Sequence, residues 1–136
     1  MVVSRSALRN FVRRAIRRLP DEYIGTMWGR RARGAKQLLI CDIQPVDHEA
    51  TPANITDWDE NDLVSGETLG PLVCWGSIHS HPLHSDSSPS EEDWEFFAQQ
   101  KEMLSAICYI TRGGWRHSTR TRFYFSQALV KMQYGP

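Results

Sequence analysis

Cysteine is scarce in this sequence and is not arranged in pairs. The 136 residues include Cys41, Cys74 and Cys108, which are odd in number, widely spaced and embedded in apolar runs, and no Cys-x-x-Cys pair is present. A free cysteine in such a run behaves as a small hydrophobic residue. We therefore predict three buried free thiols rather than a disulfide framework, which suits a protein of a reducing compartment.

Long apolar segments are also missing. The first residues, Met1 to Arg5, lack the apolar stretch of a signal peptide, and no run elsewhere approaches the length that spans a membrane. Internal repeats, heptads and low-complexity tracts are absent as well, which argues against a solenoid or a coiled coil. We expect a cytoplasmic protein without a membrane partner, folded as one domain over residues 1–136.

An excess of one charge sign is missing from the chain as a whole, but not from its parts. Sixteen basic and sixteen acidic residues give a net charge of zero, which makes wholesale binding to nucleic acid unfavourable. Residues 1–36 nevertheless carry ten basic residues against two acids, residues 37–102 fourteen acids against one lysine, and residues 103–136 five basic residues and no acid. This separation is typical of a solvated surface with internal charge pairs. The alternative is an acidic rim that attracts a basic partner.

The patterns that are present predict a single α/β domain. Residues 4–19 repeat apolar side chains at helical spacing, with arginines on most of the remaining surface and Pro20 at the end. The other expected elements are strands at 2–3, 22–28, 37–46 and 72–81, a helix at 91–103, strands at 105–111 and 121–126, and a short helix or edge strand at 127–134. Helices and strands in this order predict a mixed β-sheet flanked by helices.

Residues with metal-binding chemistry gather in one short stretch. His79 and His81 stand two apart directly after an apolar run, and residues i and i+2 of a strand project from the same face. Pro82 then ends the strand because it has no N–H to donate to the ladder. Ser90 and Asp93 follow at the start of the second predicted helix, with Asp93 in its first turn and aimed back toward the strand end. Two imidazoles and a carboxylate that converge make a three-ligand zinc site, with a fourth position left for water.

Simpler interpretations exist for some of these groups. Ser-x-x-Asp is also the pattern of an ordinary helix cap, but its combination with His-x-His-Pro favours the metal site. The other histidines, His48, His84 and His117, are expected at the rim or on the surface. Cys74 stands five residues before His79, so on a regular strand it faces away from the metal and belongs to the core. A hydrolytic site also needs a general base, which spacing alone does not place.

The combined pattern resembles a known family of metalloproteases. The stretches His79-Ser80-His81-Pro82 and Ser90-Glu91-Glu92-Asp93, seven residues apart, are similar to the JAMM motif of the JAB1/MPN family, His-x-His-Pro-x7-Ser-x-x-Asp. Upstream, the chain contains Pro20-Asp21-Glu22-Tyr23-Ile24-Gly25, which resembles the family's Pro-x-Glu-x-x-Gly segment and follows an amphipathic helix, as it does there. The order of elements agrees over nearly the whole chain. The resemblance implies a single JAB1/MPN domain with a cytidine-deaminase-like fold.

The resemblance also implies a role for each residue of the site. His79, His81 and Asp93 would bind Zn²⁺. Glu22 would be the general acid/base that activates the attacking water, and Ser90 would hydrogen-bond near the zinc and help to stabilise the oxyanion, besides capping its helix. The nearest rival of Glu22 is the preceding aspartate, but one step along a strand reverses the face on which a side chain lies.

Peptidases of this family cut peptide or isopeptide bonds after the C-terminal tail of ubiquitin or a ubiquitin-like protein. The resemblance therefore implies a deubiquitinase-like zinc (iso)peptidase for deconjugation or precursor processing, for example in a bacterial antiphage system with E1- and E2-like partners. The substrate tail would bind as a strand added to a sheet edge near the zinc, and residues 52–70 lie where a lid or groove wall is expected. A short segment joins the second helix to the strand at 105–111, as in a compact, prokaryotic-type member.

Three other functions stay open at this point. A JAMM peptidase could instead trim a sulfur-carrier protein or a phage-tail substrate. A RadC-like nucleic-acid-associated protein has a similar motif, and the arginine-rich first helix favours it, although RadC proteins typically have Asn and Ser-Gly where this chain has Ser80 and Leu83-His84. The third alternative is a catalytically silent scaffold, against which the intact set of ligands argues.

Overall fold

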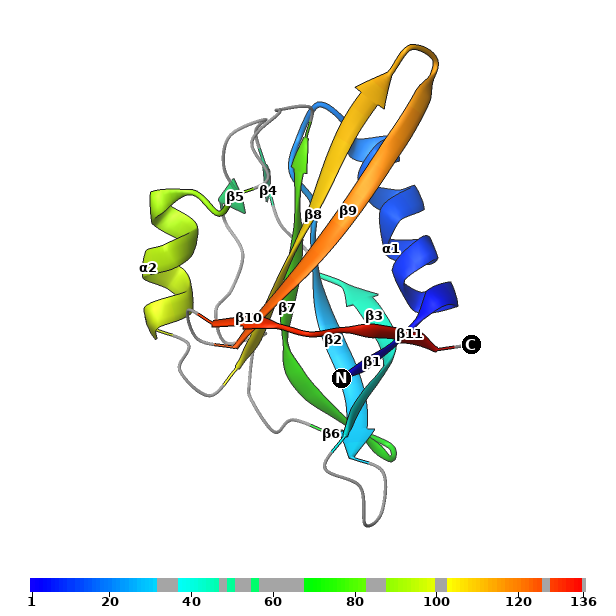
Figure 1. The fold of residues 1–136 in the computed structure, drawn as a ribbon, viewed down its shortest axis with the longest axis vertical. Coiled ribbons are helices and arrows are strands. Elements are labelled where there is room, and N and C mark those ends of the chain that lie inside the picture. Colours follow the sequence, from blue (N-terminus) through cyan, green and yellow to red (C-terminus); the bar gives the residue numbers. More distant parts are fainter. Residues whose placement is uncertain are drawn as a thin grey trace.

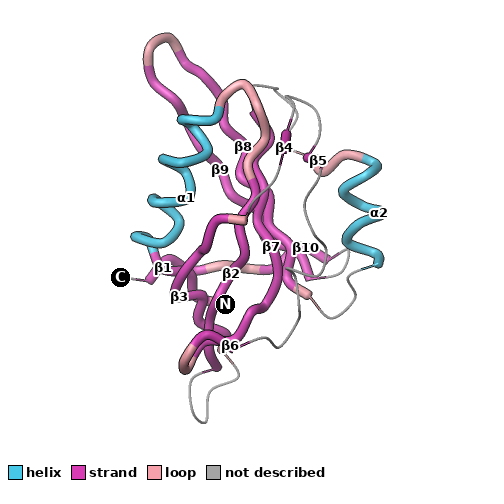
Figure 2. The backbone as a smooth tube through the Cα atoms, turned by 180° about the vertical axis from the view of Figure 1, so that it is seen from behind, coloured by secondary structure: helices cyan, strands magenta, loops and turns pink. Residues whose placement is uncertain are grey.

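The protein is a curled mixed sheet between two helices. The structure, a computed structural model, describes residues 1–31, 37–46, 49–50, 55–56, 68–82, 88–99, 103–125 and 128–135. Figure 1 shows α1 (Arg5–Arg18) on one side of the sheet and α2 (Glu91–Gln99) on the other, and the view from behind in Figure 2 agrees. The predicted fold, a mixed β-sheet flanked by helices, is confirmed.

The sheet places the middle of the chain at its centre. Its strands follow the order β10-β9-β8-β7-β2-β3-β1-β11, with β6 paired to β7 beside this path. The strands of this sheet are β1 (Val2–Ser4), β2 (Ile24–Arg31), β3 (Leu38–Pro45), β6 (Thr68–Leu69), β7 (Leu72–Pro82), β8 (Leu104–Gly113), β9 (Arg116–Phe125), β10 (Ala128–Val130) and β11 (Gln133–Gly135). Two further strands, β4 (Glu49–Ala50) and β5 (Ile55–Thr56), pair with each other in a separate sheet. β7 runs parallel to β8, and β1 runs parallel to β3 and β11.

Helix α1 forms for the reasons that its sequence indicates. Ser4 is the N-cap, and its side chain accepts a hydrogen bond from the N–H of Ala7 at 3.4 Å. The helix ends at Arg18, shortly before Pro20, which cannot continue it. Its arginines are exposed, whereas its apolar stripe packs on the sheet. The fully covered members of that stripe are Ala7, Leu8, Phe11 and Ala15.

The prediction that all three thiols are buried is wrong for one of them. Cys41 is exposed on β3, while the other two cysteines are buried and all three are free thiols. The cause is a β-bulge: Trp28 pairs with Asp42, but the next residue of β2, Gly29, pairs with Ile40. Cys41 is therefore the extra residue of the bulge, and it points away from the core that holds Ile40.

A second bulge lies on β7. Met27 pairs with Gly76, but the next residue, Trp28, pairs with Cys74, which leaves Trp75 as the extra residue. Gly76 has a φ of +150°, and a Cβ at this position would lie 1.6 Å from a backbone oxygen of β8. Glycine is therefore the residue that this close approach of β7 and β8 permits.

The bulge on β7 reverses the predicted orientation of Cys74. Ile24 and Trp28 lie four residues apart on β2, so they share a face, and their partners on β7 are His79 and Cys74. Cys74 is buried in the core as predicted, but it lies on the same face of the sheet as His79. The prediction of the opposite face was wrong because it assumed a strand without a bulge.

The other predicted elements are present with shifted ends, whereas the short strands β4, β5 and β6 were not predicted. β2 begins two residues later than expected, and β8 and β9 are longer than expected because they continue together as a hairpin. Residues 127–134 contribute β10 and β11, which decides between the predicted helix and edge strand in favour of strands. Among the described residues, no helix is long and apolar enough to cross a membrane.

Candidate metal centre

Strand β7 directs two histidines to the same side of the sheet. It is an interior strand at this point, since β2 pairs with His79 on one side and β8 pairs with both His79 and His81 on the other. Between the histidines, Ser80 lies on the opposite face, where its Oγ accepts a hydrogen bond from the N–H of Tyr23 at 2.9 Å. This regular alternation holds both imidazoles on one face. From Gly76 to Ser80, β7 is thus bonded to a neighbouring strand on each side.

Helix α2 supplies the third group from its first turn. The N–H of Asp93 donates to Oγ of Ser90 at 3.1 Å, and the N–H of Ser90 donates to Oδ2 of Asp93 at 2.8 Å. This reciprocal pair is the capping box that the Ser-x-x-Asp pattern indicates. The box fixes the Asp93 carboxylate at the helix start, on the side that faces the end of β7.

The three side chains meet at one point. Nε2 of His79 lies 3.0 Å from Oδ1 of Asp93, Nε2 of His81 lies 3.0 Å from Oδ2 of Asp93, and the two Nε2 atoms are 3.1 Å apart. Zinc with nitrogen and oxygen ligands at about 2.0–2.1 Å in a tetrahedron holds neighbouring donors about 3.3 Å from each other. The spacing and the chemistry of these donors therefore fit a zinc ion with three protein ligands.

The charge state of Asp93 suits a metal ligand. Burial acts to raise the pKa of this carboxyl group, but the hydrogen bonds to His79 and His81 outweigh burial and hold the pKa well below its usual range. Asp93 is therefore ionised at neutral pH. An ionised carboxylate and two imidazole nitrogens are the donor set that zinc binds.

Glu22 lies beside this group, just before β2. The N–H of Ser80 donates to the backbone oxygen of Tyr23 at 2.8 Å, which continues the pairing of β2 with β7 beyond Ile24 and His79. One further step of the same register brings Glu22 next to His81, on the face that carries the imidazoles. The sequence singled out this glutamate, and the structure brings it to the three donors.

Glu22 is buried, with 8% of the residue exposed. Burial raises its pKa above the usual value, and the neighbouring charges of His79 and His81 act in the opposite direction. Asp21 is one residue away, only partly buried, and on the other face if the strand alternation is continued. A buried carboxyl group with a raised pKa beside a metal-binding cluster has the properties of a general acid/base.

Tyr109 is a neighbour of the cluster that the sequence did not single out. It is 3% exposed, it pairs with His81 across β7 and β8, and its ring meets the His81 ring edge-on with centroids 5.4 Å apart. Burial, together with Tyr124, raises the pKa of the Tyr109 hydroxyl, which stays neutral. The one signal in the sequence is the position of this residue in the strand at 105–111, which does not reveal that β8 lies next to β7.

The structure describes the other residues that the sequence singled out only in part. His117 is exposed on β9, as expected of a surface histidine. His48 and His84 lie outside the described residues. Of the expected lid at 52–70, the structure describes 55–56 and 68–70, so its predicted place against the metal centre stays a prediction.

Comparison with known proteins agrees with the geometry. A family model described as prokaryotic homologues of the JAB domain matches residues 4–126. A crystal structure of a JAB1/MPN domain protein from Archaeoglobus fulgidus is 20% identical, with a TM-score of 0.64 and 98% of each chain covered. A solution structure of a protein from Desulfitobacterium hafniense is 16% identical, with a TM-score of 0.60 over 99% of this chain and 93% of that one. No curated protein matches the chain.

Proposed function

The chain belongs to the family of prokaryotic homologues of the JAB domain, and from this premise we propose that it is a zinc-dependent (iso)peptidase. Its substrate is the bond that follows the C-terminal tail of a ubiquitin-like protein. The observation that supports this proposal most directly is the convergence of His79, His81 and Asp93, with donor atoms 3.0–3.1 Å apart, beside the buried Glu22.

The ligand set is suited to hydrolysis rather than to a purely structural metal. Structural zinc sites are usually closed by four protein ligands, whereas catalytic sites have three and an open position. A zinc ion held by His79, His81 and Asp93 would supply a Lewis acid that polarises the scissile carbonyl and makes water more acidic. The capping box, in which Ser90 and Asp93 bond each other, keeps the carboxylate oriented without help from the metal.

Glu22 is the residue we assign to proton transfer. Its carboxylate takes a proton from the attacking water as the water oxygen bonds to the carbonyl carbon. The same proton passes to the leaving nitrogen as the carbon–nitrogen bond breaks, which regenerates the carboxylate and gives a free tail carboxyl group and a free amine. The pKa of Glu22 is raised, so uptake and release of the proton by its carboxyl group differ less in free energy. A general acid/base is most effective when its pKa lies close to the working pH.

Ser90 is assigned a supporting role at the oxyanion. Its Oγ accepts a hydrogen bond from the N–H of Asp93, so its hydroxyl hydrogen stays available for another acceptor. Donation of that hydrogen to the developing oxyanion would add to the polarisation of the carbonyl.

The test compares Glu22→Gln with Asp21→Asn in a cleavage assay on a ubiquitin-like protein fused through its tail to a reporter. The Glu22→Gln variant should retain zinc, measured by elemental analysis, and lose turnover by about 100-fold or more, the range expected for loss of a general acid/base. Asp21→Asn removes a neighbouring carboxylate and should cleave normally. Equal turnover in the two variants would show that the proton-transfer assignment is incorrect.

A second comparison separates metal binding from catalysis. His81→Ala removes one of three ligands, so this variant should lose both zinc and cleavage, and adding excess zinc should restore neither fully. If the wild-type protein binds zinc but cleaves no ubiquitin-like fusion, the proposed metal centre is supported and the proposed substrate is incorrect.

A further inference from the structure

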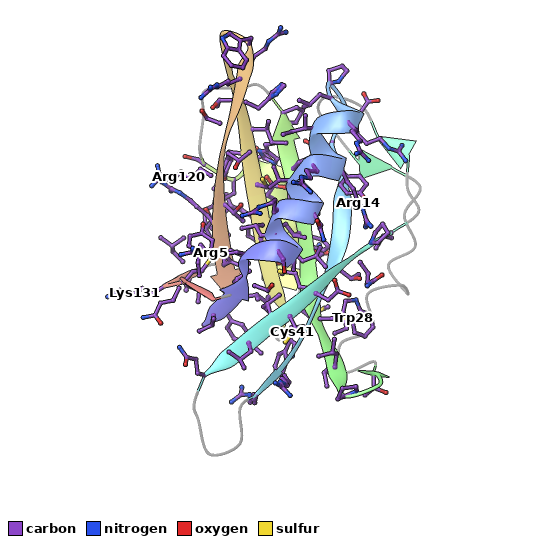
Figure 3. All side chains as sticks on the ribbon, turned by 90° about the vertical axis from the view of Figure 1, so that its right-hand side faces the viewer. Arg5, Arg14, Trp28, Cys41, Arg120 and Lys131 are labelled. Carbon is purple, nitrogen blue, oxygen red and sulfur yellow. The ribbon has the colours of Figure 1, made fainter. Side chains whose placement is uncertain are left out.

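The fold brings together two segments that contain no acidic residue. Residues 1–20 contain six arginines, residues 103–136 contain four arginines and one lysine, and neither segment contains Asp or Glu. β1 pairs with β11, and α1 lies along β9, with which it lines a groove. Figure 3 shows Arg5, Arg120 and Lys131 on the same side of the molecule. We call this surface the basic face; its members are Arg5, Arg9, Arg112, Arg116, Arg120, Arg122 and Lys131.

Cations of the basic face lie on both sides of strand β9, in two separate hollows. On one side of β9, the groove is lined by the side chains of Arg5, Arg9, Thr119, Thr121 and Tyr134. On the other side, Arg120, Arg122 and Lys131 line a second hollow next to β10. An elongated anion that follows β9 therefore meets guanidinium groups to either side.

Residues 116–122 of β9 form a strand edge that is open to a ligand. β10 pairs with β9 only at residues 123–125, so among the described strands β8 alone pairs with residues 116–122. Every residue from Thr111 to Arg120 is exposed, and the hairpin of β8 and β9 projects beyond the two helices in Figures 1 and 2. Its tip carries Trp115, which is 81% exposed, with the Arg116 guanidinium 4.4 Å from the ring centroid.

The arginines of this face are not neutralised by the described part of the chain. Both ion pairs found among the described residues join a histidine to Asp93, and none involves an arginine. Charged side chains on an exposed strand also prevent edge-to-edge pairing of sheets. That role accounts for Arg120 on β9, but not for Arg5 and Arg9 on a helix or for Trp115 at the tip of the hairpin.

We propose that the basic face binds single-stranded nucleic acid. The phosphates follow the exposed strand β9, between Arg5 and Arg9 on one side and Arg120 and Arg122 on the other, and bases stack on the exposed rings of Tyr134 and Trp115. Basic grooves with aromatic platforms are the usual form of single-strand binding sites. All but one of the cations are arginines, whose planar guanidinium groups bind phosphate oxygens in pairs. A surface of one charge sign over this extent is typical of nucleic-acid interfaces rather than protein interfaces.

A lipid surface is the main alternative partner for the basic face, and the zero net charge of the chain is an objection to any polyanion. Interfacial binding to lipid needs an extended apolar face. The exposed large apolar side chains here do not form one, because Trp115 precedes β9, whereas Phe125 and Leu129 lie at its other end. The zero net charge does not prevent local binding, because charges farther away than about 10 Å are largely screened at physiological salt. The acidic middle of the sequence therefore opposes the basic face less than the sum of charges suggests.

The test measures fluorescence anisotropy of a labelled oligothymidine strand against the full chain. If about four arginines contact phosphates, log affinity should fall with log salt with a slope of about −3. A duplex of the same length should bind more weakly, because its bases are not available for stacking. The third probe is polyglutamate, a polyanion without bases or phosphates, which should not compete at equal charge concentration.

Single substitutions locate the site. Arg5→Ser, Arg9→Ser and Arg120→Ser should each weaken binding and reduce the salt slope by about 0.7. Trp115→Ala should weaken binding at least about fivefold with little change of slope, since it removes stacking rather than charge. The matched control is Arg30→Ser, an exposed arginine at the far end of β2, which should bind as the wild type does. Circular dichroism checks that each variant is folded.

Four results would overturn the proposal. The first is that the single strand does not bind at low salt, and the second is that the duplex binds equally well or more tightly. The third is that polyglutamate competes at equal charge concentration, and the fourth is that Arg30→Ser and Arg120→Ser lose equal affinity for the single strand. The last two would indicate a general attraction of anions rather than a site. None of the four bears on zinc binding or on tail cleavage.

Discussion

The two faces of the sheet are built in different ways. The face under α1 holds a cluster of fifteen buried residues that runs from the helix through β3, β2, β7 and β8. On the other face, the hydrophobic cluster that packs against α2 has four buried members among the described residues, Phe97, Ile107, Tyr109 and Tyr124, with Trp94 and Phe96 packed at their side. The large cluster contains no residue of the metal centre, whereas the small one seats the helix that carries Asp93.

This difference separates stability from site geometry. Most of the apolar burial lies under α1, so losses there act mainly on the free energy of unfolding. The position of α2 depends on a few aromatic contacts, such as the stacked rings of Phe97 and Tyr124 at 5.2 Å and the edge-on rings of Trp94 and Tyr124 at 5.6 Å. Losses there should move Asp93 relative to the histidines of β7.

The largest expected effect on stability is that of Phe11→Ala under α1. Phe11 is 2% exposed, and loss of its ring should lower the free energy of unfolding by about 3–5 kcal/mol. Zinc affinity of the folded protein should stay within about twofold, since distant sites couple by about 0.5 kcal/mol or less. Urea denaturation and zinc competition with a chelating dye measure the two quantities. A tenfold loss of zinc affinity would show that the two faces are not separate.

Phe97→Ala makes the matching change under α2. The cost in unfolding free energy should be at the lower end for such a cavity, about 3 kcal/mol, because the small cluster lies near the surface and can collapse. Zinc affinity should fall about tenfold or more, as when groups that orient a ligand are removed. The same two measurements apply. If Phe97→Ala and Phe11→Ala bind zinc equally well, α2 is positioned by something other than this cluster.

Ser90→Ala tests the capping box alone. The Ser90 hydroxyl accepts the hydrogen bond from the Asp93 N–H, so its loss should cost about 1 kcal/mol of unfolding free energy and loosen the first turn of α2. Ser118→Ala, an exposed serine on β9, is the control and should stay within about 0.5 kcal/mol of the wild type. Equal stability of the two variants would mean that the cap contributes nothing measurable.

The smallest perturbation is labelling of the thiols in the native protein. Cys41 is exposed and should react rapidly with iodoacetamide. Cys108 belongs to the cluster under α1, where burial raises its pKa to about 11, so it should react only when that cluster opens. Mass spectrometry after a short pulse should find one modified thiol, and three after unfolding in urea. Three rapidly modified thiols in the native protein would contradict the buried cluster.

Much of the metal centre could be predicted because its residues are close in sequence. His79 and His81 share a face by strand alternation alone, and Ser90 and Asp93 meet by helix geometry alone. Glu22 was named by its resemblance to a family segment rather than by spacing. The sequence did not indicate Tyr109 as a neighbour, because its contact with His81 depends on β8 pairing in parallel with β7.

Local pattern failed where the strands are irregular. Cys41 was placed by the apolar run around it and Cys74 by counting residues along an ideal strand, and each lies at a bulge that shifts the alternation by one residue. A bulge is decided by the approach of neighbouring strands, such as the contact that requires Gly76 beside β8. Alternation of apolar residues carries no information about it.

The sequence by itself determined the elements, the helix cap and the chemical identity of the metal-binding groups, because these depend on side chains a few residues apart. Only the tertiary structure decided that Glu22 lies beside the histidines and that the two acid-free ends of the chain form one basic face. Those arrangements depend on strand order and register, which are selected by the packing of the whole core. No short window of residues contains that packing.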